Sequence, residues 1–279
     1  MSNGSSVINR RSPLKWAGGK KRIIEEIKAN LPLKGKQRLI EPFVGGGSVF
    51  LNIDFEEYLL LDVNKDLINL FNILKDAPKE FIREAEFLFI GDHNEEARYY
   101  QLRDEFNDTL DPYRRSLLFI YLNRHGYNGL CRYNQKGGFN VPFGRYKHPY
   151  YPREELLQFA NVAKRATFVC NDFEHAFNQA GSHDVVYCDP PYSPINRTSS
   201  FTAYAGNKFT DEDQARLVEC AMAAKQRGVS TLISNHYVDF TKQLYRSADK
   251  ITTLQVQRNI SCKGSVRSKI EEVMALYKA

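Results

Sequence analysis

The sequence predicts an α/β fold built on a mostly parallel sheet, and three observations support that prediction. Short β-rich runs alternate with helical patterns along most of the 279 residues. Strands separated by helices need crossover connections, which give parallel strands and cover both faces of the sheet. Residues 65–152 interrupt the alternation with helical segments and then a loop rich in Gly, Asn, Pro and Tyr, which indicates an inserted functional subdomain.

Seven runs in the sequence are expected to be strands. Five of them have the composition of buried strands: Arg38–Glu41, Tyr58–Leu61, Thr167–Cys170, Asp184–Cys188 and Val229–Ser234. The last two, Ile251–Arg258 and Glu272–Tyr277, have only the short Ser261–Ser265 loop region between them. They are therefore predicted to form an antiparallel hairpin that finishes the otherwise parallel sheet.

Capping signals and helical spacing place the helices between these strands. Apolar residues recur at helical spacing at Ile23, Ile24, Ile27 and Leu31. Thr210-x-x-Asp213 predicts a capping box that opens a helix, and Gly228 is expected to end it. Asp111-Pro112 is a cap and first-turn pair for a helix that runs to about Arg124.

These elements divide the chain into two parts. A discontinuous α/β domain is predicted from residues 1–64 and 153–279, and residues 65–152 are predicted to be the inserted domain. No stretch approaches the about 20 uninterrupted apolar residues that a membrane helix needs. Residues 1–11 have no apolar segment of the kind found in secretory signals.

The cysteines and the charges narrow the class of protein further. The five cysteines are scattered without a C-x-x-C pair, which argues against disulfides or a zinc cluster and for a reducing, cytoplasmic compartment. The net charge is only +6, but residues 112–153 contain eight Lys and Arg, ten Tyr and Phe, and no acid. This pattern predicts a nucleic-acid partner. The alternative is a solvated face that is neutralised by the acidic stretch at residues 39–111.

A glycine-rich loop at residues 41–48 follows the first strand and precedes what is expected to be a helical run. Glycines allow a ligand to approach the backbone closely, and the next helix would point its N–H groups at that ligand. The second strand ends at Asp62, which suits the hydroxyls of a ribose. The loop lacks the third glycine of a dinucleotide site, so S-adenosylmethionine is favoured over NAD. The alternative is a plain turn.

The most specific motif is Asp189-Pro190-Pro191-Tyr192, directly after a predicted buried strand. Successive prolines make the turn stiff, and strand ends are where open α/β sheets bind ligands. The carboxylate of Asp189 and the carbonyl of Pro190 are placed to accept the two N–H bonds of an exocyclic amine, while Tyr192 is suited to stack on a base rotated out of a duplex. The alternative is a rigid turn in which Asp189 caps a neighbouring segment.

Together these motifs resemble those of the Dam family of DNA adenine-N6 methyltransferases, in which a glycine motif, a target-recognition region and D-P-P-Y follow in this order. The similar segments are Leu14–Lys20, Glu41–Gly45, Asn123–Asn134, Phe139–Tyr146 and Phe201–Tyr204. The resemblance implies a Rossmann-like fold that binds S-adenosylmethionine, with residues 65–152 as the target-recognition domain. It also implies a monomer that methylates adenine in GATC on double-stranded DNA and releases S-adenosylhomocysteine, without a metal or an obligate protein partner. Such an enzyme is expected in the cytoplasm of a bacterial or phage-infected cell, associated with the nucleoid.

The resemblance also assigns site residues. Those implied in cofactor binding are Trp16, Lys20, Phe43, Gly45, Asp62, Asp172, Phe173 and Asp189, while Asp189, Pro190 and Tyr192 are implied in catalysis. Those implied in DNA binding are Lys15, Arg124, Tyr127, Asn128, Arg132, Pro142 and Tyr146. Among them Arg132 suits a bidentate contact to guanine, and Tyr127 suits a wedge beside the vacated adenine.

Two kinds of alternative remain open from the sequence. A close one is methylation of another amine or amide, namely cytosine N4, an RNA base or a protein amide. A distant one is a nucleic-acid-binding module with an inactive methylase site, against which the uninterrupted motifs at residues 14–20 and 189–192 argue. The sequence leaves the physiological role open among mismatch repair, replication, gene control, phage protection and restriction–modification.

Overall fold

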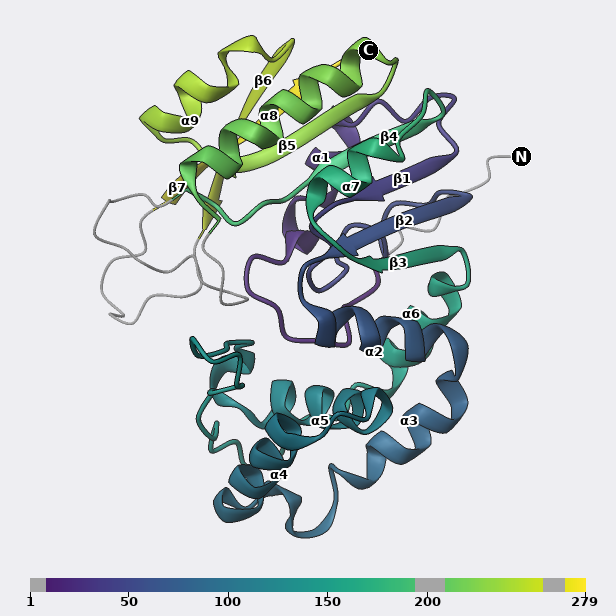
Figure 1. Cartoon of the computed structure of the whole chain (residues 1–279), viewed down its shortest axis with the longest axis vertical. Coiled ribbons are helices and arrows are strands. Elements are labelled where there is room, and N and C mark those ends of the chain that lie inside the picture. Colours follow the sequence, from purple (N-terminus) through teal and green to yellow (C-terminus); the bar gives the residue numbers. More distant parts are fainter. Residues whose placement is uncertain (1–8, 194–208, 258–268) are drawn as a thin grey trace.

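A computed structural model describes residues 9–193, 209–257 and 269–279 (Figure 1). The described strands form one sheet of seven in the order β3-β2-β1-β4-β5-β7-β6. Their bounds are β1 (Arg38–Glu41), β2 (Glu57–Asp62), β3 (Ala166–Cys170), β4 (Asp184–Cys188), β5 (Ser230–His236), β6 (Lys250–Gln257) and β7 (Lys269–Tyr277). The sheet gathers the carboxyl ends of its five parallel strands along one edge.

All five predicted buried strands are present within a residue or two of their expected bounds. β1 pairs in parallel with both β2 and β4, and β3 and β5 extend the parallel sheet on the two sides. The prediction of a mostly parallel sheet is therefore confirmed. It succeeds because runs such as Asp184–Cys188, with no exposed residue, need cover on both faces and find it in crossover helices.

The C-terminal pair of strands is an antiparallel hairpin, as predicted. β7 pairs antiparallel with β5 on one side and with β6 on the other, so β7 lies inside the sheet and β6 forms its edge. The Ser261–Ser265 loop and Arg258 lie outside the described residues. The hairpin places the first half of β7 beside the carboxyl end of β5, where His236 pairs with Glu272.

Helices cover both faces of the sheet. One face is packed by α1 (Ile24–Asn30) and α6 (Arg153–Ala163), and the other by α7 (Phe173–Asn178) and α8 (Asp211–Gln226). The short helix η1 (Lys20–Ile23) leads into α1, while α9 (Asp239–Leu244) and η4 (Tyr245–Ser247) connect β5 to β6. The predicted capping box of Thr210 and Asp213 is present, and Gly228 follows α8 with a φ of 84°.

The prediction of a helical run after the glycine loop is wrong. Residues 42–53 form a series of turns, and only isolated i→i−4 bonds such as Leu51 N to Gly47 O are present. Gly47 has a φ of 75°, and a Cβ at this position would lie 2.6 Å from the Phe50 ring. A left-handed residue does not continue a right-handed helix, so the segment folds as a loop.

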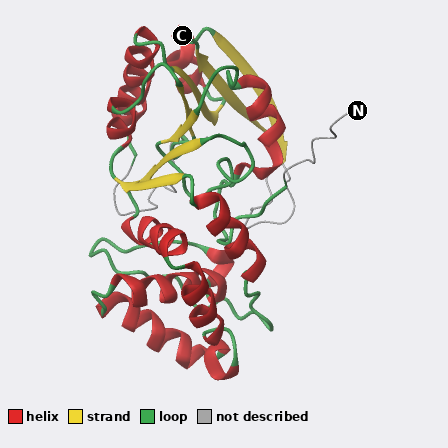
Figure 2. Cartoon of the chain, turned by 90° about the vertical axis from the view of Figure 1, so that its right-hand side faces the viewer, coloured by secondary structure: helices red, strands yellow, loops and turns green. Residues whose placement is uncertain are grey.

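The inserted segment is a separate layer of helices beneath the sheet (Figure 2). It contains α2 (Lys65–Asp76), α3 (Pro78–Phe87), η2 (Gly91–Asn94), α4 (Glu96–Asp108), α5 (Pro112–His125) and η3 (Tyr127–Gly129). The predicted helix from Pro112 is confirmed, and the side chain of Asp111 caps it by accepting from two backbone N–H groups. Residues 130–152 then run without helix or strand.

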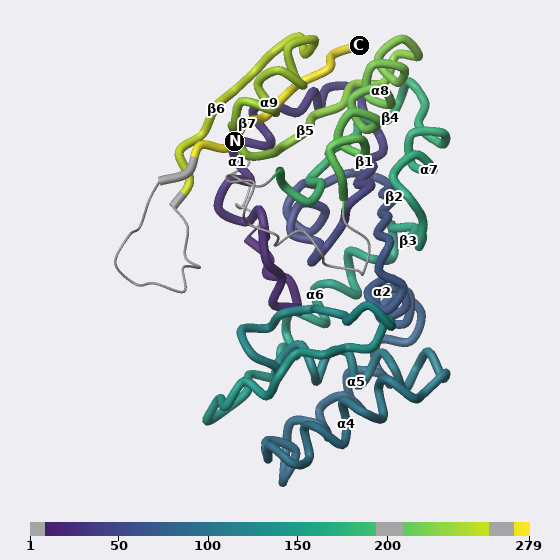
Figure 3. Tube along the Cα trace, turned by 60° about the vertical axis from the view of Figure 1, so that its left-hand side comes forward, coloured from purple at the N-terminus to yellow at the C-terminus, as the bar shows by residue number. Residues whose placement is uncertain are grey.

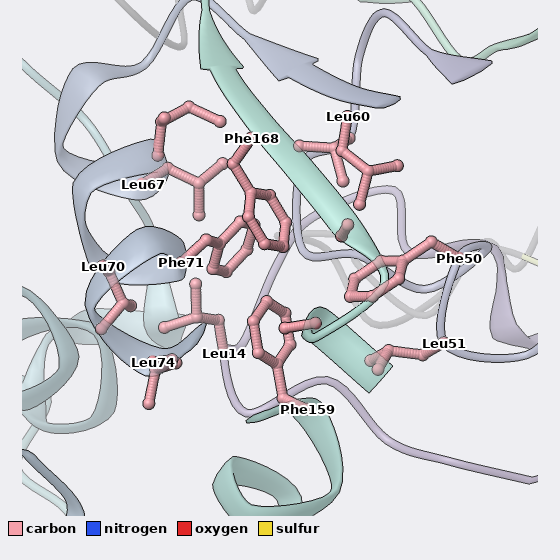
Figure 4. Packing of buried hydrophobic residues seen from close by; sticks show 14 of the residues in the cluster. Leu14, Phe50, Leu51, Leu60, Leu67, Leu70, Phe71, Leu74, Phe159 and Phe168 are labelled. Atoms are coloured by element: carbon pink, nitrogen blue, oxygen red, sulfur yellow. The ribbon is translucent and has the colours of Figure 1, made fainter. Parts of the chain in front are cut away.

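One hydrophobic core joins this layer to the sheet. Figure 4 shows the ring of Phe71 of α2 beside those of Phe168 of β3 and Phe159 of α6, and Leu67, Leu70 and Leu74 of α2 belong to the same cluster. The ring centroids of Phe71 and Phe159 are 4.5 Å apart, and those of Phe71 and Phe168 are 5.4 Å apart. α2 therefore packs on the sheet as well as on the insert, and the boundary at residue 65 stays a prediction.

Candidate active site

The tetrapeptide at residues 189–192 follows β4 directly and lies at the carboxyl edge of the sheet. Lys20 reaches this corner from η1, with its Nζ 3.0 Å from Oδ1 of Asp189. Lys20 is only 7% exposed, so the ion pair is largely shielded from water. The same ammonium lies 4.3 Å from the centroid of the Tyr192 ring. The structure thus brings three of the predicted residues, Lys20, Asp189 and Tyr192, into contact.

Buried amides hold this turn from behind. Gln214 of α8 donates to the carbonyl of Pro191 at 2.8 Å, and Asn235 of β5 accepts from the N–H of Ser193 at 3.0 Å. Asn235 also donates to Gln214 and to the hydroxyl of Tyr245, and it is fully buried. These supporting residues were missed from the sequence, because a single amide on a helix or strand has no local pattern that marks it.

The corner contains another buried acid, which sequence reasoning placed in the glycine loop without a role. Glu41 at the end of β1 is 2% exposed, and its Oε1 has no hydrogen-bond partner. Burial, and next the charge of Asp189, raises the pKa of Glu41 well above its ordinary value. Burial also raises the pKa of Asp189, while the Lys20 ammonium opposes that shift. Glu41 is therefore the more readily protonated of the two acids.

The glycine loop and the acid that ends β2 are joined directly. Oδ2 of Asp62 accepts from the N–H of Gly45 at 3.0 Å, and its Oδ1 accepts from the N–H of Asn64. Trp16 packs on the glycines, since a Cβ at Gly45 would lie 2.8 Å from its Nε1 and Gly45 has a φ of 47°. The predicted set of Trp16, Gly45 and Asp62 is therefore one packed unit, and glycine is needed for that contact.

Phe43, Asp172 and Phe173 extend this unit along the edge of the sheet. The Phe43 ring lies 5.6 Å from that of Phe173, which is 2% exposed. Asp172 accepts from the N–H of Glu174 at the start of α7 and forms an ion pair with Arg216 at 3.3 Å. The partly exposed Phe43 is thus the ring with an accessible face, and Phe173 supports it from the core.

Residues 13–20 cross from the sheet to the inserted layer (Figure 3). Asn123 of α5 fixes them, because it accepts from the N–H of Lys15 and donates to the carbonyl of Lys15, both at 2.8 Å. Its amide also donates to the carbonyl of Gly129 at 3.1 Å, and Asn123 is 1% exposed. A single buried side chain therefore ties Lys15 to the loop that follows α5.

Three of the predicted DNA-binding residues are exposed on that loop. Tyr127 is 50% exposed, and Asn128 is exposed with a φ of 53°. Arg132 is also exposed, and its Nε donates to Oδ1 of Asn140 at 2.8 Å. The guanidinium of Arg132 is thus held at the surface with a defined orientation.

Pro142, Tyr146 and Lys15 border the same loop. The carbonyl of Pro142 accepts from the N–H of Tyr127 at 2.8 Å, and Pro142 is exposed. Nζ of Lys15 lies 4.0 Å from the centroid of the Tyr146 ring. Burial lowers the pKa of Lys15, and the charge of Arg124 adds to this effect. The predicted DNA-binding residues other than Arg124 therefore lie on, or next to, the loop that follows α5.

Arg124 is set back from this surface, and its role in DNA binding stays a prediction. It is 8% exposed, and its Nε and Nη2 both donate to the carbonyl of Pro13. Its guanidinium lies over the ring of Tyr150 at 5.6 Å. These contacts of Arg124 with its own chain hold residues 13–20 in place.

The basic charge of residues 112–153 is partly neutralised within the protein. Four of its eight cations form ion pairs with acids of the stretch at residues 39–111: Arg114 with Glu105, Arg115 with Asp66, Arg145 with Glu96 and Arg153 with Glu86. The alternative interpretation, in which the acidic stretch neutralises the basic segment, therefore holds for half of these cations. The charge pattern alone overstated the size of the basic surface.

Two further expectations concern metal binding and membrane insertion. Across residues 9–193, 209–257 and 269–279, no three His, Cys, Asp or Glu side chains are grouped as a metal site would require. No helix within these ranges has the length and apolar character needed to cross a membrane. The similar segment Phe201–Tyr204 lies outside them.

Comparison with known proteins identifies the family. The model of the D12 class N6 adenine-specific DNA methyltransferases matches residues 16–260. The chain belongs to this family. The match covers the glycine loop, the inserted layer and the tetrapeptide at residues 189–192, so the predicted family and enzyme class are confirmed.

Curated relatives extend the similarity of the methyltransferase over nearly its whole length. It is 51% identical over 269 residues to the DNA adenine methylase of Vibrio cholerae, covering 96% of each chain. It is 51% identical over 268 residues to the DNA adenine methylase of Escherichia coli K12, covering 96% of this chain and 95% of that protein. Solved structures are more remote: a precorrin-6y C5,15-methyltransferase from Geobacter metallireducens aligns with a TM-score of 0.38 and 9% identity, over 93% of this chain and 89% of that one.

Proposed function

We propose that the enzyme transfers a methyl group from S-adenosylmethionine to N6 of adenine in GATC sites of double-stranded DNA. The observation that carries the proposal is the shielded ion pair of Asp189 with Lys20 beside the ring of Tyr192, on a turn held by buried amides. Such a corner is rigid before substrate arrives, which is what transition-state stabilisation requires.

The residues around the corner fit this cofactor. S-adenosylmethionine carries positive charge and a ribose, and the edge of the sheet provides two partly buried acids, Asp189 to face the positive charge and Asp62 to accept from the ribose hydroxyls. Trp16 and the accessible face of Phe43 supply apolar cover for an adenosine. When bound, the cofactor supplies an electrophilic methyl group. Asp172 and Phe173 support this site from α7.

The protein's part in the transfer is to hold the amine. The N6 lone pair of adenine is delocalised into the ring, so the amine is a weak nucleophile at rest. Asp189 and the carbonyl of Pro190 accept its two N–H bonds, which favours a tetrahedral nitrogen with its lone pair directed at the methyl carbon. A bound cofactor would supply the methyl carbon for the new N–C bond and a sulfur that would keep the electron pair of the broken C–S bond, and Asp189 would take the proton that the nitrogen loses. Tyr192 stacks on the extruded base.

We assign DNA binding to the surface of the loop that follows α5. Lys15, Asn128, Pro142 and Tyr146 line it, while Tyr127 at 50% exposure is the residue with a ring free to enter the base stack. Inserting a ring beside the target base offsets part of the cost of extruding it, which is a few kcal/mol. We further propose that the enzyme acts as a monomer in the cytoplasm, associated with the nucleoid.

Incubation of an unmethylated plasmid with enzyme and S-adenosylmethionine tests the proposed function. Subsequent digestion with GATC-cutting nucleases that differ in their sensitivity to adenine methylation reports both the base and the sequence. The proposal is supported if the plasmid resists the methylation-sensitive nuclease but is still cut by the insensitive one. Mass spectrometry of the digested nucleosides separates N6-methyladenine from N4-methylcytosine, and a binding module without activity would give neither product.

The pH dependence of kcat/KM is predicted from the environment of Asp189. Its carboxylate must be ionised to accept N–H bonds, and burial raises its pKa above the ordinary value of 3.8. Activity is therefore expected to fall, as the pH is lowered, at a higher pH than for an exposed aspartate. Replacing Lys20 by glutamine removes the cation that opposes the shift, so the acidic limb should move to higher pH. A limb that stays in place would contradict this electrostatic account.

Replacing Arg132 by alanine is predicted to relax sequence discrimination. Its guanidinium is oriented by Asn140, so it is suited to a bidentate contact with one guanine. We expect a loss of about 1–3 kcal/mol in discrimination at that base pair, measured as kcat/KM on GATC and on duplexes with one substituted pair. The matched control is Lys136→Ala on the same loop. Equal losses on all sequences would make Arg132 a phosphate contact.

A further inference from the structure

A third carboxylate, that of Glu272, lies at the catalytic corner although it comes from the far end of the chain. Glu272 pairs with His236 across β7 and β5, and Met274 pairs with Ser234 two residues further along. Because side chains on one strand alternate between faces, Glu272 and Met274 share the face of the sheet that carries Asp189. Sequence reasoning treated Glu272 as part of a strand only.

The carboxylate of Glu272 holds the hydroxyl of Tyr192. Tyr192 Oη donates to Glu272 Oε2 at 3.2 Å. The hydroxyl also has side-chain hydrogen-bond contacts with Asp189 and Ser234. The ring itself is contacted by Lys20, which lies over it at 4.3 Å, and by the His236 ring, which meets it edge-on at 4.7 Å. The hydroxyl lies on the axis of the ring, so the bond to Glu272 restrains the torsion χ1 that places the ring, while the contacts with Lys20 and His236 limit rotation of the ring about that axis.

We propose that Glu272 is a positioning residue for methyl transfer, which holds the hydroxyl of Tyr192 so that the ring keeps its place beside Asp189. This inference rests on the proposed function, because the ring is of use only if a base enters that corner. Without the hydrogen bond the ring would have to be ordered by the base during each turnover, and that ordering would be added to the barrier.

The charge of Glu272 also acts on Asp189. The groups that face Asp189 are Lys20, Glu41, Tyr187, Tyr192 and Glu272, with Ser234 donating to its Oδ1 at 3.4 Å. Burial is the main cause that raises the pKa of Asp189, and the Glu272 carboxylate adds to it. Neutralising Glu272 should therefore move the acidic limb of the pH profile to lower pH.

The test is a double-mutant cycle on kcat with Tyr192→Phe and Glu272→Ala. Each single variant is expected to lose about tenfold in kcat, the scale of one hydrogen bond to a charged group, with an unchanged KM for S-adenosylmethionine. If the two side chains act through one bond, the double variant loses no more than either single one. Glu272→Gln retains an acceptor oxygen and should recover most of the activity, with its acidic limb at lower pH.

The strand itself offers the matched control. Glu271 is exposed and points to the opposite face of β7, so Glu271→Ala should have wild-type kcat. Losses that multiply in the double variant, or a Glu272→Ala enzyme with wild-type kcat, would overturn the proposal. A crystal structure of Glu272→Ala gives a readout without activity, since an unmoved, equally ordered Tyr192 would also overturn it. Failure of the wild-type enzyme to methylate DNA would instead refute the proposed function.

Discussion

Asp189→Ala is expected to lower kcat by about 10²–10⁴-fold, the range observed when a proton-accepting group is removed from a site. The variant loses the acceptor for one N–H bond of the target amine and the ion-pair partner of Lys20. Radiolabelled methyl transfer to a GATC duplex measures the loss directly. Asp189→Asn keeps the shape and one acceptor oxygen but not the charge, so it should lie between the wild-type enzyme and Asp189→Ala.

The melting temperature is the control for this prediction, because a destabilised fold would also lower the activity. Lys20 is largely buried, and without its partner it becomes an uncompensated cation, so the Tm of Asp189→Ala should fall. The double variant Lys20→Met/Asp189→Ala removes both charges and should recover part of the Tm without recovering turnover. Turnover close to the wild-type value in either alanine variant would remove Asp189 from the mechanism.

Asp66→Ala is expected to lower the free energy of unfolding by about 3–5 kcal/mol, because it leaves a largely buried cation without its partner. Asp66 is 7% exposed and lies at the start of α2. It forms an ion pair with Arg115 of α5 through two N–H groups and accepts from the hydroxyl of Tyr133 at 2.7 Å. One carboxylate therefore joins α2, α5 and the loop that carries Arg132.

Denaturant unfolding followed by circular dichroism measures this loss. Asp104→Ala on α4 is the matched control, because the Asp104 side chain is 69% exposed and its ion pair with Arg103 is long, at 4.0 Å. This variant should change the free energy of unfolding by less than about 0.5 kcal/mol. A loss in Asp66→Ala no larger than in Asp104→Ala would show that the buried ion pair contributes little. Asp66→Asn retains the acceptor for Tyr133 and should be less destabilised than Asp66→Ala.

Features encoded over a few consecutive residues were predictable from the sequence. The strand at residues 184–188 is a run that must be buried on both faces, and the capping box at Thr210 satisfies backbone groups within its own first turn. The tetrapeptide at residues 189–192 was predicted as the reactive corner for the same reason, because its position after a strand determines its place in the fold.

Features that depend on contacts between distant segments were not predictable. Arg124 has the local context of an exposed helix end, and only the approach of Pro13, 111 residues away, buries its guanidinium. Residues 42–53 did not form the expected helix, and within them Phe50 packs on Phe159 and Phe168, more than one hundred residues away, which is a tertiary contact that can override propensity. Glu272 is one of two adjacent glutamates, and only the pairing of β7 with β5 decides which of them faces Tyr192.

The position of the inserted layer has a consequence for assembly of the sheet. β2 ends at Asp62 and its neighbour β3 begins at Ala166, so their pairing closes a loop of about one hundred residues. The entropic penalty of such closure grows only logarithmically with length, but it must be met before the strand contacts stabilise anything. Because α2 packs against both α6 and β3, the two ends of the loop meet in the native state. The helical layer that leads to the loop after α5 therefore also holds the edge strand β3 beside β2.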